Sequence, residues 1–251
     1  MRALIALLVV LSPLCEAIAG AWPQNPGETF TSQTFRYFAT DAKDNPKFER
    51  ASVAAYAEYG LLETVTLGVE LDQGQRLDET GKGLTGGRLG GFVRARVWRG
   101  EAGDVASIQV GASTPISGLQ IAAAPGEDDA KEYKALLQYG RGFQSEWGTG
   151  WAEAAFGFAH QTGGRADEIK FDATLGLRPD ENWIALAQLF GTYGLRNAAF
   201  AAPDFDVAKV QLSVGRKFLK NRTLIIGVAR DVFARGTDKG WEASLSIWST
   251  F

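Results

Sequence analysis

The segment from Glu168 to Arg178 alternates strictly between apolar and polar residues. A period of two residues is that of a β-strand, because successive side chains of a strand point to opposite faces. One face carries Ile169, Phe171, Ala173, Leu175 and Leu177, and the other carries Glu168, Lys170, Asp172, Thr174, Gly176 and Arg178. The charged row does not fit the dry core of a soluble sheet. The pattern therefore predicts a strand with an apolar outside and a polar inside.

The same alternation recurs along the chain. It is clear in 64–72, 88–98 and 209–218, and weaker in 28–38, 47–59, 105–113, 131–140, 148–162, 182–195, 222–235 and 240–251. The total is twelve strands, an even number, as in bacterial single-chain outer-membrane barrels. Short turns alternate with longer loops between them, with two short exceptions near Gly163 and Gly236. We therefore predict an all-β fold, a transmembrane antiparallel up-and-down barrel formed by residues 28–251.

The last strand ends on an aromatic residue, Phe251. Its apolar face also carries Trp241, Ala243, Leu245 and Ile247. This end resembles the C-terminal recognition signal of bacterial outer-membrane proteins, which the barrel-assembly machinery reads. The resemblance implies that machinery as a partner, together with outer-membrane lipid and lipopolysaccharide. The alternative is the amphipathic last strand of a soluble sandwich.

The other end has the features of a secretory signal peptide, which we place at residues 1–21. Met1-Arg2 is followed by an apolar run from Ala3 to Leu14 and by small-x-small sites at 17–19 and 19–21. Cleavage is expected after Ala19 or Ala21. It would remove Cys15, the single cysteine, so no disulfide is expected in the mature chain. No later segment approaches the ~20 apolar residues of a membrane helix, so a spanning structure must be a closed barrel.

Composition favours the same class. The chain has 30 Gly, 7 Trp and 15 Phe, and glycines and aromatics in evenly spaced short strands are typical of barrels. Trp183 and Tyr193 share the outer face of one predicted strand, where each would join an interfacial aromatic girdle. A formal net charge of −3 provides no basic stripe for nucleic acid. No phosphate-binding loop or metal-ligand cluster is present in the pattern, so we expect no cofactor.

One hairpin carries a family resemblance. The stretch Glu58-Tyr59-Gly60-Leu61-Leu62-Glu63-Thr64-Val65-Thr66-Leu67-Gly68 resembles the hallmark hairpin of a bacterial outer-membrane family named for the meta-pathway of phenol degradation. The segment from Glu168 through Pro179 to Gln188 is similar to a second block, found in alphaproteobacterial members. The resemblance implies an outer-membrane channel for small solutes, with aromatic compounds as one class. Leu62 departs from the family pattern, which has Thr or Ser before the acidic residue.

The inward rows supply the candidate lumen and selectivity residues. These are Glu70, Asp72, Arg88, Arg94, Arg96, Lys170, Asp172 and Arg178. The strand with the three arginines follows the strand with Glu70 and Asp72, so cross-strand ion pairs are expected. Either such pairs fill a narrow barrel, or the arginines form an anion-attracting constriction. Because twelve strands lie between filled barrels of about eight and open porins of about sixteen, we predict a passive channel. The alternative is a non-conducting structural or anchoring barrel.

A second alternative is a lipid hydrolase. The stretch His160-Gln161-Thr162 is similar to the His-x-Ser stretch of outer-membrane phospholipase A. Thr162 replaces the serine nucleophile, and the outward row of the following strand offers no asparagine to orient the imidazole. Because such a hydrolase needs a nucleophile, a base and an orienting group, we predict no enzymatic activity and assign no catalytic residue.

Overall fold

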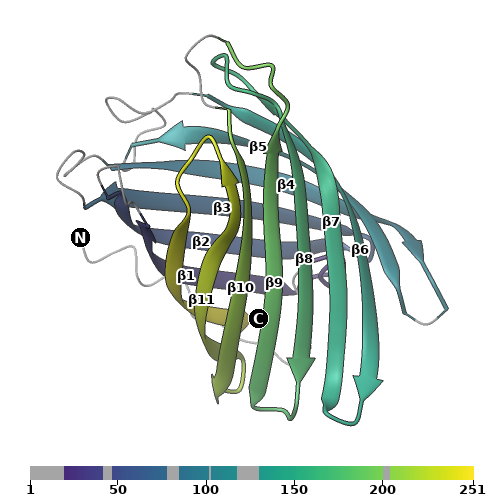
Figure 1. Ribbon diagram of the computed structural model, residues 1–251. Coiled ribbons are helices and arrows are strands. Elements are labelled where there is room, and N and C mark those ends of the chain that lie inside the picture. Colours follow the sequence, from purple (N-terminus) through teal and green to yellow (C-terminus); the bar gives the residue numbers. More distant parts are fainter. Residues whose placement is uncertain (1–19, 42–46, 78–84, 102, 118–129, 200–203) are drawn as a thin grey trace, which may run out of the picture.

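The computed structural model describes residues 20–41, 47–77, 85–101, 103–117, 130–199 and 204–251. Within these ranges the chain forms a closed antiparallel barrel (Figure 1), in which β1 pairs with β12. The strands are β1 (Thr29–Thr40), β2 (Glu49–Leu62), β3 (Val65–Arg76), β4 (Thr85–Arg99), β5 (Val105–Ile116), β6 (Glu132–Ser145), β7 (Gly148–Gln161), β8 (Glu168–Arg178), β9 (Trp183–Gly194), β10 (Asp206–Leu219), β11 (Arg222–Arg235) and β12 (Gly240–Thr250). The predicted fold class and strand count are confirmed. The predicted leader lies almost wholly outside the described residues.

The alternation places apolar side chains outside and polar side chains inside. Leu137, Phe156 and Val228 point away from the barrel and are 58%, 60% and 61% exposed, whereas Thr66 and Ser107 on the inner face are fully buried. An apolar belt of this kind matches hydrocarbon, because single-chain barrels expose such a band to lipid. Among the described residues, no helix combines the length and the apolar character needed to cross a membrane.

Strand β4 departs from strict alternation near the turn that follows it. The pairing of β4 with β5 shifts register between Arg96 and Trp98. Such a bulge sets two residues of one strand against one of its partner. Val97 and Trp98 are consequently both exposed, at 56% and 50%. Strict alternation over residues 88–98 would place Trp98 on the inner face with Arg88, Arg94 and Arg96; that orientation is wrong for Trp98, because the bulge turns it outward.

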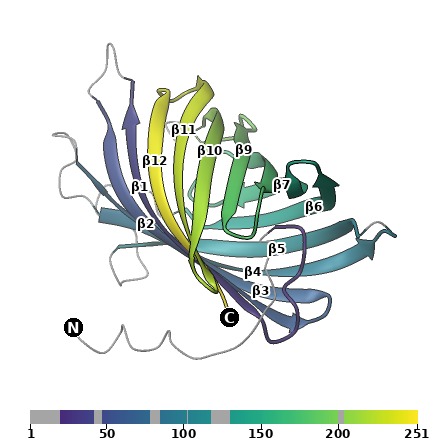
Figure 2. The ribbon, with the colours of Figure 1, turned by 90° about the horizontal axis from the view of Figure 1, so that it is seen from below.

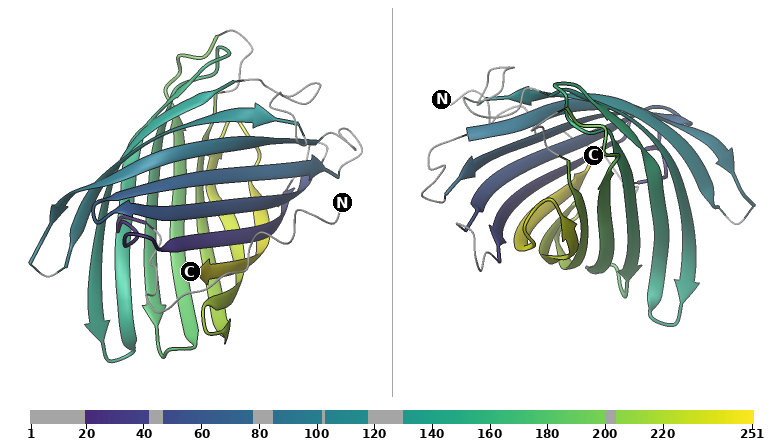
Figure 3. Two further views of the ribbon diagram at one scale, coloured as in Figure 1. Left: turned by 180° about the vertical axis from the view of Figure 1, so that it is seen from behind. Right: turned by 45° about the horizontal axis from the view of Figure 1, so that its top comes forward.

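The two ends of the barrel differ in their connections. At the end that holds Thr29 and Thr250, which we call the turn end, the connections are 63–64, 100–104, 146–147, 179–182 and 220–221. At the opposite end, the loop end, they are 41–48, 77–84, 117–131, 162–167, 195–205 and 236–239. The predicted asymmetry between short turns and longer loops is confirmed. Figure 3 shows the purple-to-blue strands crossing the direction of the green strands, as expected for strongly tilted strands on opposite walls.

Residues 20–28, which we call the N-terminal segment, lie inside the turn end of the barrel (Figure 2). Ser107 Oγ on β5 donates a hydrogen bond to the Ala21 carbonyl at 2.6 Å. The Gln24 backbone N–H donates to Thr66 Oγ1 on β3 at 2.9 Å. The sequence pattern predicted that the barrel starts at residue 28, and it predicted no structure for the residues between the leader and that point. The structure shows that they fill part of the lumen.

Two glycines of the wall make room for the N-terminal segment. A Cβ at Gly60 on β2 would lie 1.9 Å from the Asn25 carbonyl oxygen. A Cβ at Gly140 on β6 would lie 2.6 Å from the Trp22 ring. Because real side chains do not tolerate such separations, glycine at these two positions lets the segment approach the wall closely.

Candidate functional site in the barrel lumen

Glu58 on β2 and Arg94 on β4 form a buried ion pair on the inner face of the wall. Arg94 Nη2 lies 2.6 Å from Glu58 Oε1, and the two side chains are only 0–1% exposed. The Tyr56 hydroxyl donates to Glu58. Gln24 Nε2 of the N-terminal segment also donates to Glu58, at 2.6 Å. Arg94 is therefore shielded from solvent and has no access to an ion in the open part of the lumen.

The acids Glu70 and Asp72 on β3 pair with bases on strands other than β4. Asp72 accepts hydrogen bonds from Arg50 Nη2 on β2 at 2.7 Å and from Arg36 Nη1 on β1 at 3.2 Å. Glu70 accepts from Lys134 Nζ on β6 at 2.6 Å, across β4 and β5. These ion pairs come from β1, β2 and β6, whereas the sequence pattern pointed to the arginines of β4. Arg50 lies on the other neighbour of β3, whereas Arg36 and Lys134 lie on strands that do not pair with β3 and reach it because the curvature of the barrel brings inward side chains together.

Lys170 and Asp172 lie on the inner face of β8. Lys170 pairs with Glu168 on its own strand, and its Nζ lies 3.6 Å from Glu132 Oε2 on β6. Gln161 Nε2 donates to the same Glu132 oxygen at 2.9 Å. This charged group lies toward the loop end, because β8 begins and β7 ends there. Asp172 lies further into the lumen, where it borders a cavity.

The other predicted lumen residues are spread along the barrel. Arg88 lies near the loop end of β4 and donates to Ser113 Oγ at 3.2 Å. Arg178 lies at the turn end of β8, with its guanidinium carbon 5.4 Å from the centre of the Trp151 ring. Arg96 is partly exposed beside the β4 bulge. The candidate arginines therefore do not converge on a single constriction.

An apolar cluster occupies the turn end of the lumen. Trp151, Ile184, Leu186 and Ile225 form it, each 4% exposed, and Trp22 and Trp248 pack against it. The sequence interpretation missed this cluster because it expected the inward row to be polar throughout. The signal was present in the period of β9: with Trp183 and Tyr193 outside, Ile184 and Leu186 must face inward.

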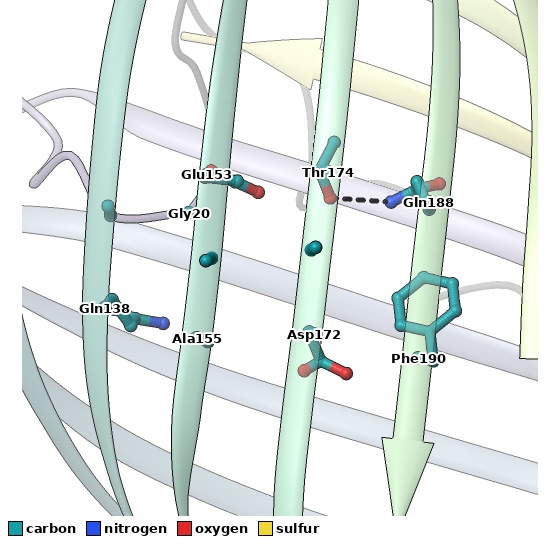
Figure 4. Close-up of a pocket in the computed structure, with 11 residues that line it drawn as sticks. Gly20, Gln138, Glu153, Ala155, Asp172, Thr174, Gln188 and Phe190 are labelled. Carbon is teal, nitrogen blue, oxygen red and sulfur yellow. Dashed lines mark hydrogen bonds between the residues drawn. The ribbon is translucent and has the colours of Figure 1, made fainter. Parts of the chain in front are cut away.

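A cavity of about 170 Å³ lies beside the N-terminal segment and the strands β6–β9 (Figure 4). Its lining includes Gly20, Ala21, Gln138, Glu153, Asp172, Thr174, Gln188 and Phe190. Gln188 Nε2 donates to Thr174 Oγ1 at 3.3 Å. The cavity thus combines two carboxylates, amide groups and one aromatic ring. Within the described ranges, no group of three or more His, Cys, Asp or Glu is placed to hold a metal ion.

His160 lies at the loop end of β7 with an acidic partner that the sequence interpretation did not assign. Its Nδ1 is 2.7 Å from Asp167 Oδ1 in the β7–β8 connection. Partial burial acts to raise the pKa of Asp167, but hydrogen bonds from the Gln161 N–H, the Asn197 amide and His160 outweigh it and lower this pKa. The expectation that His160 lacks an orienting group is therefore corrected. Thr162 Oγ1 accepts a hydrogen bond from the Lys131 N–H at 2.8 Å.

Sequence comparisons with known proteins identify no family for this chain. No protein-family model matches the chain. No curated protein matches it either. The hairpin resemblance therefore stays a prediction.

Among solved structures, the COG4313 outer membrane channel from Pseudomonas putida F1 is similar, with a TM-score of 0.61 and 15% identity over 95% of this chain and 100% of that one. The NanC porin gives 0.55 and 6% identity, over 86% and 98% of the two chains. The translocator domain of the autotransporter NalP from Neisseria meningitidis gives 0.50 and 12%, over 91% and 90%. At these identities the likeness establishes the fold alone: the chain has the fold of outer-membrane β-barrels.

Proposed function

We propose that this protein is a passive channel for small solutes in the outer membrane of a Gram-negative bacterium. The cavity of about 170 Å³ carries the proposal. It lies in the lumen, and its lining combines polar side chains with alanines and one phenyl ring, so it provides space for water or a small solute. The apolar outer belt supports the membrane location, since only a closed barrel satisfies every strand hydrogen bond in lipid.

The lining of the cavity favours solutes that combine an aromatic ring with a polar or cationic group. Phe190 offers a ring face, and Asp172 offers a carboxylate on the neighbouring strand (Figure 4). The apolar cluster around Trp151 and Trp22 continues the apolar surface toward the turn end. A few placed polar groups within an apolar wall are typical of small-molecule sites. This inference agrees with the aromatic solutes implied by the hairpin resemblance.

Single-channel recording in planar bilayers tests the channel itself. We expect discrete conductance from the wild-type barrel and a larger conductance from Trp22→Ala, because Trp22 occupies lumen space at the turn end. Trp147→Ala is the matched control, since Trp147 lies in the β6–β7 turn and is 71% exposed. Its conductance should equal that of the wild type. If neither the wild type nor Trp22→Ala conducts, the protein is a structural or anchoring barrel.

Partial block of the current tests the solute class. Benzylammonium and butylammonium carry the same charge, but only the first has an aromatic ring. We expect stronger block by benzylammonium, and loss of the difference in Phe190→Leu. Equal block by the two ions in the wild type would contradict the aromatic preference and leave the channel function standing.

We also propose that Phe251 is read by the barrel-assembly machinery and that lipid and lipopolysaccharide contact the apolar belt. Two features support this. The apolar face of β12 points outward, with Trp241 and Leu245 exposed. The Phe251 backbone also joins β1, because its N–H donates to the Thr29 carbonyl at 2.8 Å. A signal at Phe251 would thus sit at the strand that closes the barrel.

A further inference from the structure

Glu153 on β7 points into the lumen beside the first described residue, Gly20 (Figure 4). Its side chain accepts hydrogen bonds from the Ala21 backbone and from Thr174. Its Oε2 atom is nevertheless buried and has no hydrogen-bond partner. Arg94, whose charge also acts on Glu153, is already paired with Glu58. A buried carboxylate oxygen without a donor is costly, so this atom calls for a partner.

Gly20 is the residue nearest to that oxygen. A Cβ built on Gly20 would lie 1.7 Å from Glu153 Oε2, so the carboxylate occupies the space that any other side chain would fill. The backbone nitrogen of a residue is within about 2.5 Å of its Cβ position, which brings the Gly20 nitrogen within roughly 4 Å of Oε2. The φ angle of Gly20 is 126°, in the region that favours glycine.

We infer that the leader is removed by hydrolysis of the bond between residues 19 and 20, and that the new Gly20 ammonium pairs with Glu153 inside the lumen. An export-pathway signal peptidase would supply the catalyst and water the co-reactant. The water adds a hydroxyl to the Ala19 carbonyl carbon and a hydrogen to the Gly20 nitrogen. That nitrogen then takes up one proton. The Gly20 nitrogen changes from an amide with a single hydrogen to an ammonium with three donors and a positive charge. The uncleaved chain offers Glu153 no such cation at Gly20. Ala19 itself lies outside the described residues.

Cleavage after Ala21, the other site that the sequence allows, fits the lumen poorly. Ala21 is 1% exposed, and its carbonyl accepts the hydrogen bond from Ser107 Oγ. Its backbone also provides a hydrogen bond to Glu153. Removing residues 20 and 21 would leave both buried polar groups without these partners and open a void beside Gly140. The inference does not depend on whether the barrel conducts.

The amino-terminal sequence of the protein purified from outer membranes tests the cleavage site. We expect it to begin Gly20-Ala21-Trp22. A chain that begins at Trp22, or that retains the leader, overturns the inference regardless of how any variant behaves.

Acylation of amines tests the ion pair, because the reagent attacks only an unprotonated and accessible amino group. We expect the Gly20 amine of the folded barrel to react at least about tenfold more slowly than in heat-denatured protein, the effect of one pKa unit. The readout is the mass of the tryptic peptide 20–36, and Lys220 in the β10–β11 turn serves as an internal standard.

Glu153→Gln should restore fast labelling of Gly20 in barrels that keep the gel shift of the folded form. Glu146→Gln is the matched control, since it changes an exposed carboxylate in the β6–β7 turn of the same end. It should leave the rate unchanged. Equal rates in the two variants overturn the ion pair. If Glu153→Gln does not fold, the comparison of folded and denatured wild type decides the question.

Discussion

Glu58 and Arg94 are joined across β3, and neither side chain touches solvent. The pair connects three strands of one wall with the N-terminal segment, because Gln24 donates to the same carboxylate. Its role is to hold the wall and the segment together, since Glu58 neutralises the charge of Arg94 and the buried guanidinium cannot contact an ion in the lumen.

Arg94→Met is expected to destabilise the folded barrel by about 3–5 kcal/mol, because it leaves the Glu58 carboxylate buried without its partner. Arg36→Met should cost about 0–1 kcal/mol, because its pair with Asp72 is partly exposed. Urea titration of the barrel in detergent, followed by the gel shift on heating, measures both. Equal losses in the two variants would contradict the structural role of the buried pair. Combining Arg94→Met with Glu58→Gln should recover part of the stability that Arg94→Met alone loses, because no buried carboxylate is then left without its partner.

Val228→Arg is expected to destabilise the inserted barrel by about 2–4 kcal/mol, because Val228 lies outward near the middle of β11. Gln211→Arg, on the inner face of β10, is the control and should cost less than about 1 kcal/mol. Folding into vesicles of defined thickness measures the difference. Similar costs for both would show that β11 does not face hydrocarbon.

Replacing Phe251 by lysine is expected to reduce the amount of assembled barrel while leaving export intact. The substitution keeps the two backbone hydrogen bonds between residue 251 and Thr29. A charge near the membrane interface costs only about 0–1 kcal/mol by itself, so a larger defect reports lost recognition. Heat-modifiable protein in membrane fractions provides the measurement, with Thr250→Lys as a control on the opposite face. Normal levels of folded barrel in the Phe251 variant would rule out the proposed signal.

His160→Ala is expected to cause no loss of lipid hydrolysis, because we expect the wild type to have none. Asp167 orients His160, but it also accepts hydrogen bonds from Gln161 and Asn197 and so ties two loops together. The test is an assay of detergent-solubilised protein on a phospholipid, with and without calcium. Activity that disappears in both His160→Ala and Thr162→Ala would instead make this a threonine hydrolase.

The alternation of apolar and polar residues was sufficient to predict the barrel, its strand count and the outward faces of the regular parts of the strands. Outward side chains make no contacts across the lumen, so their orientation follows from the chain's own period. The lumen was less predictable, because contacts there join strands that are distant in sequence. Lys134 reaches Glu70 across β4 and β5, and no local pattern specifies that distance. The β4 bulge at Arg96 and Trp98 likewise depends on pairing with β5.

The N-terminal segment has a consequence for the order of events in folding. Its hydrogen-bond partners come from β3, β5 and β7, so no small fragment of the wall can hold it. The segment leads directly into β1, and β1 is the strand that pairs with β12. Ordering the segment therefore also fixes the position of the strand that closes the cylinder. We therefore expect the filling of the interior and the joining of the first strand to the last to be coupled steps, because both depend on the position of β1.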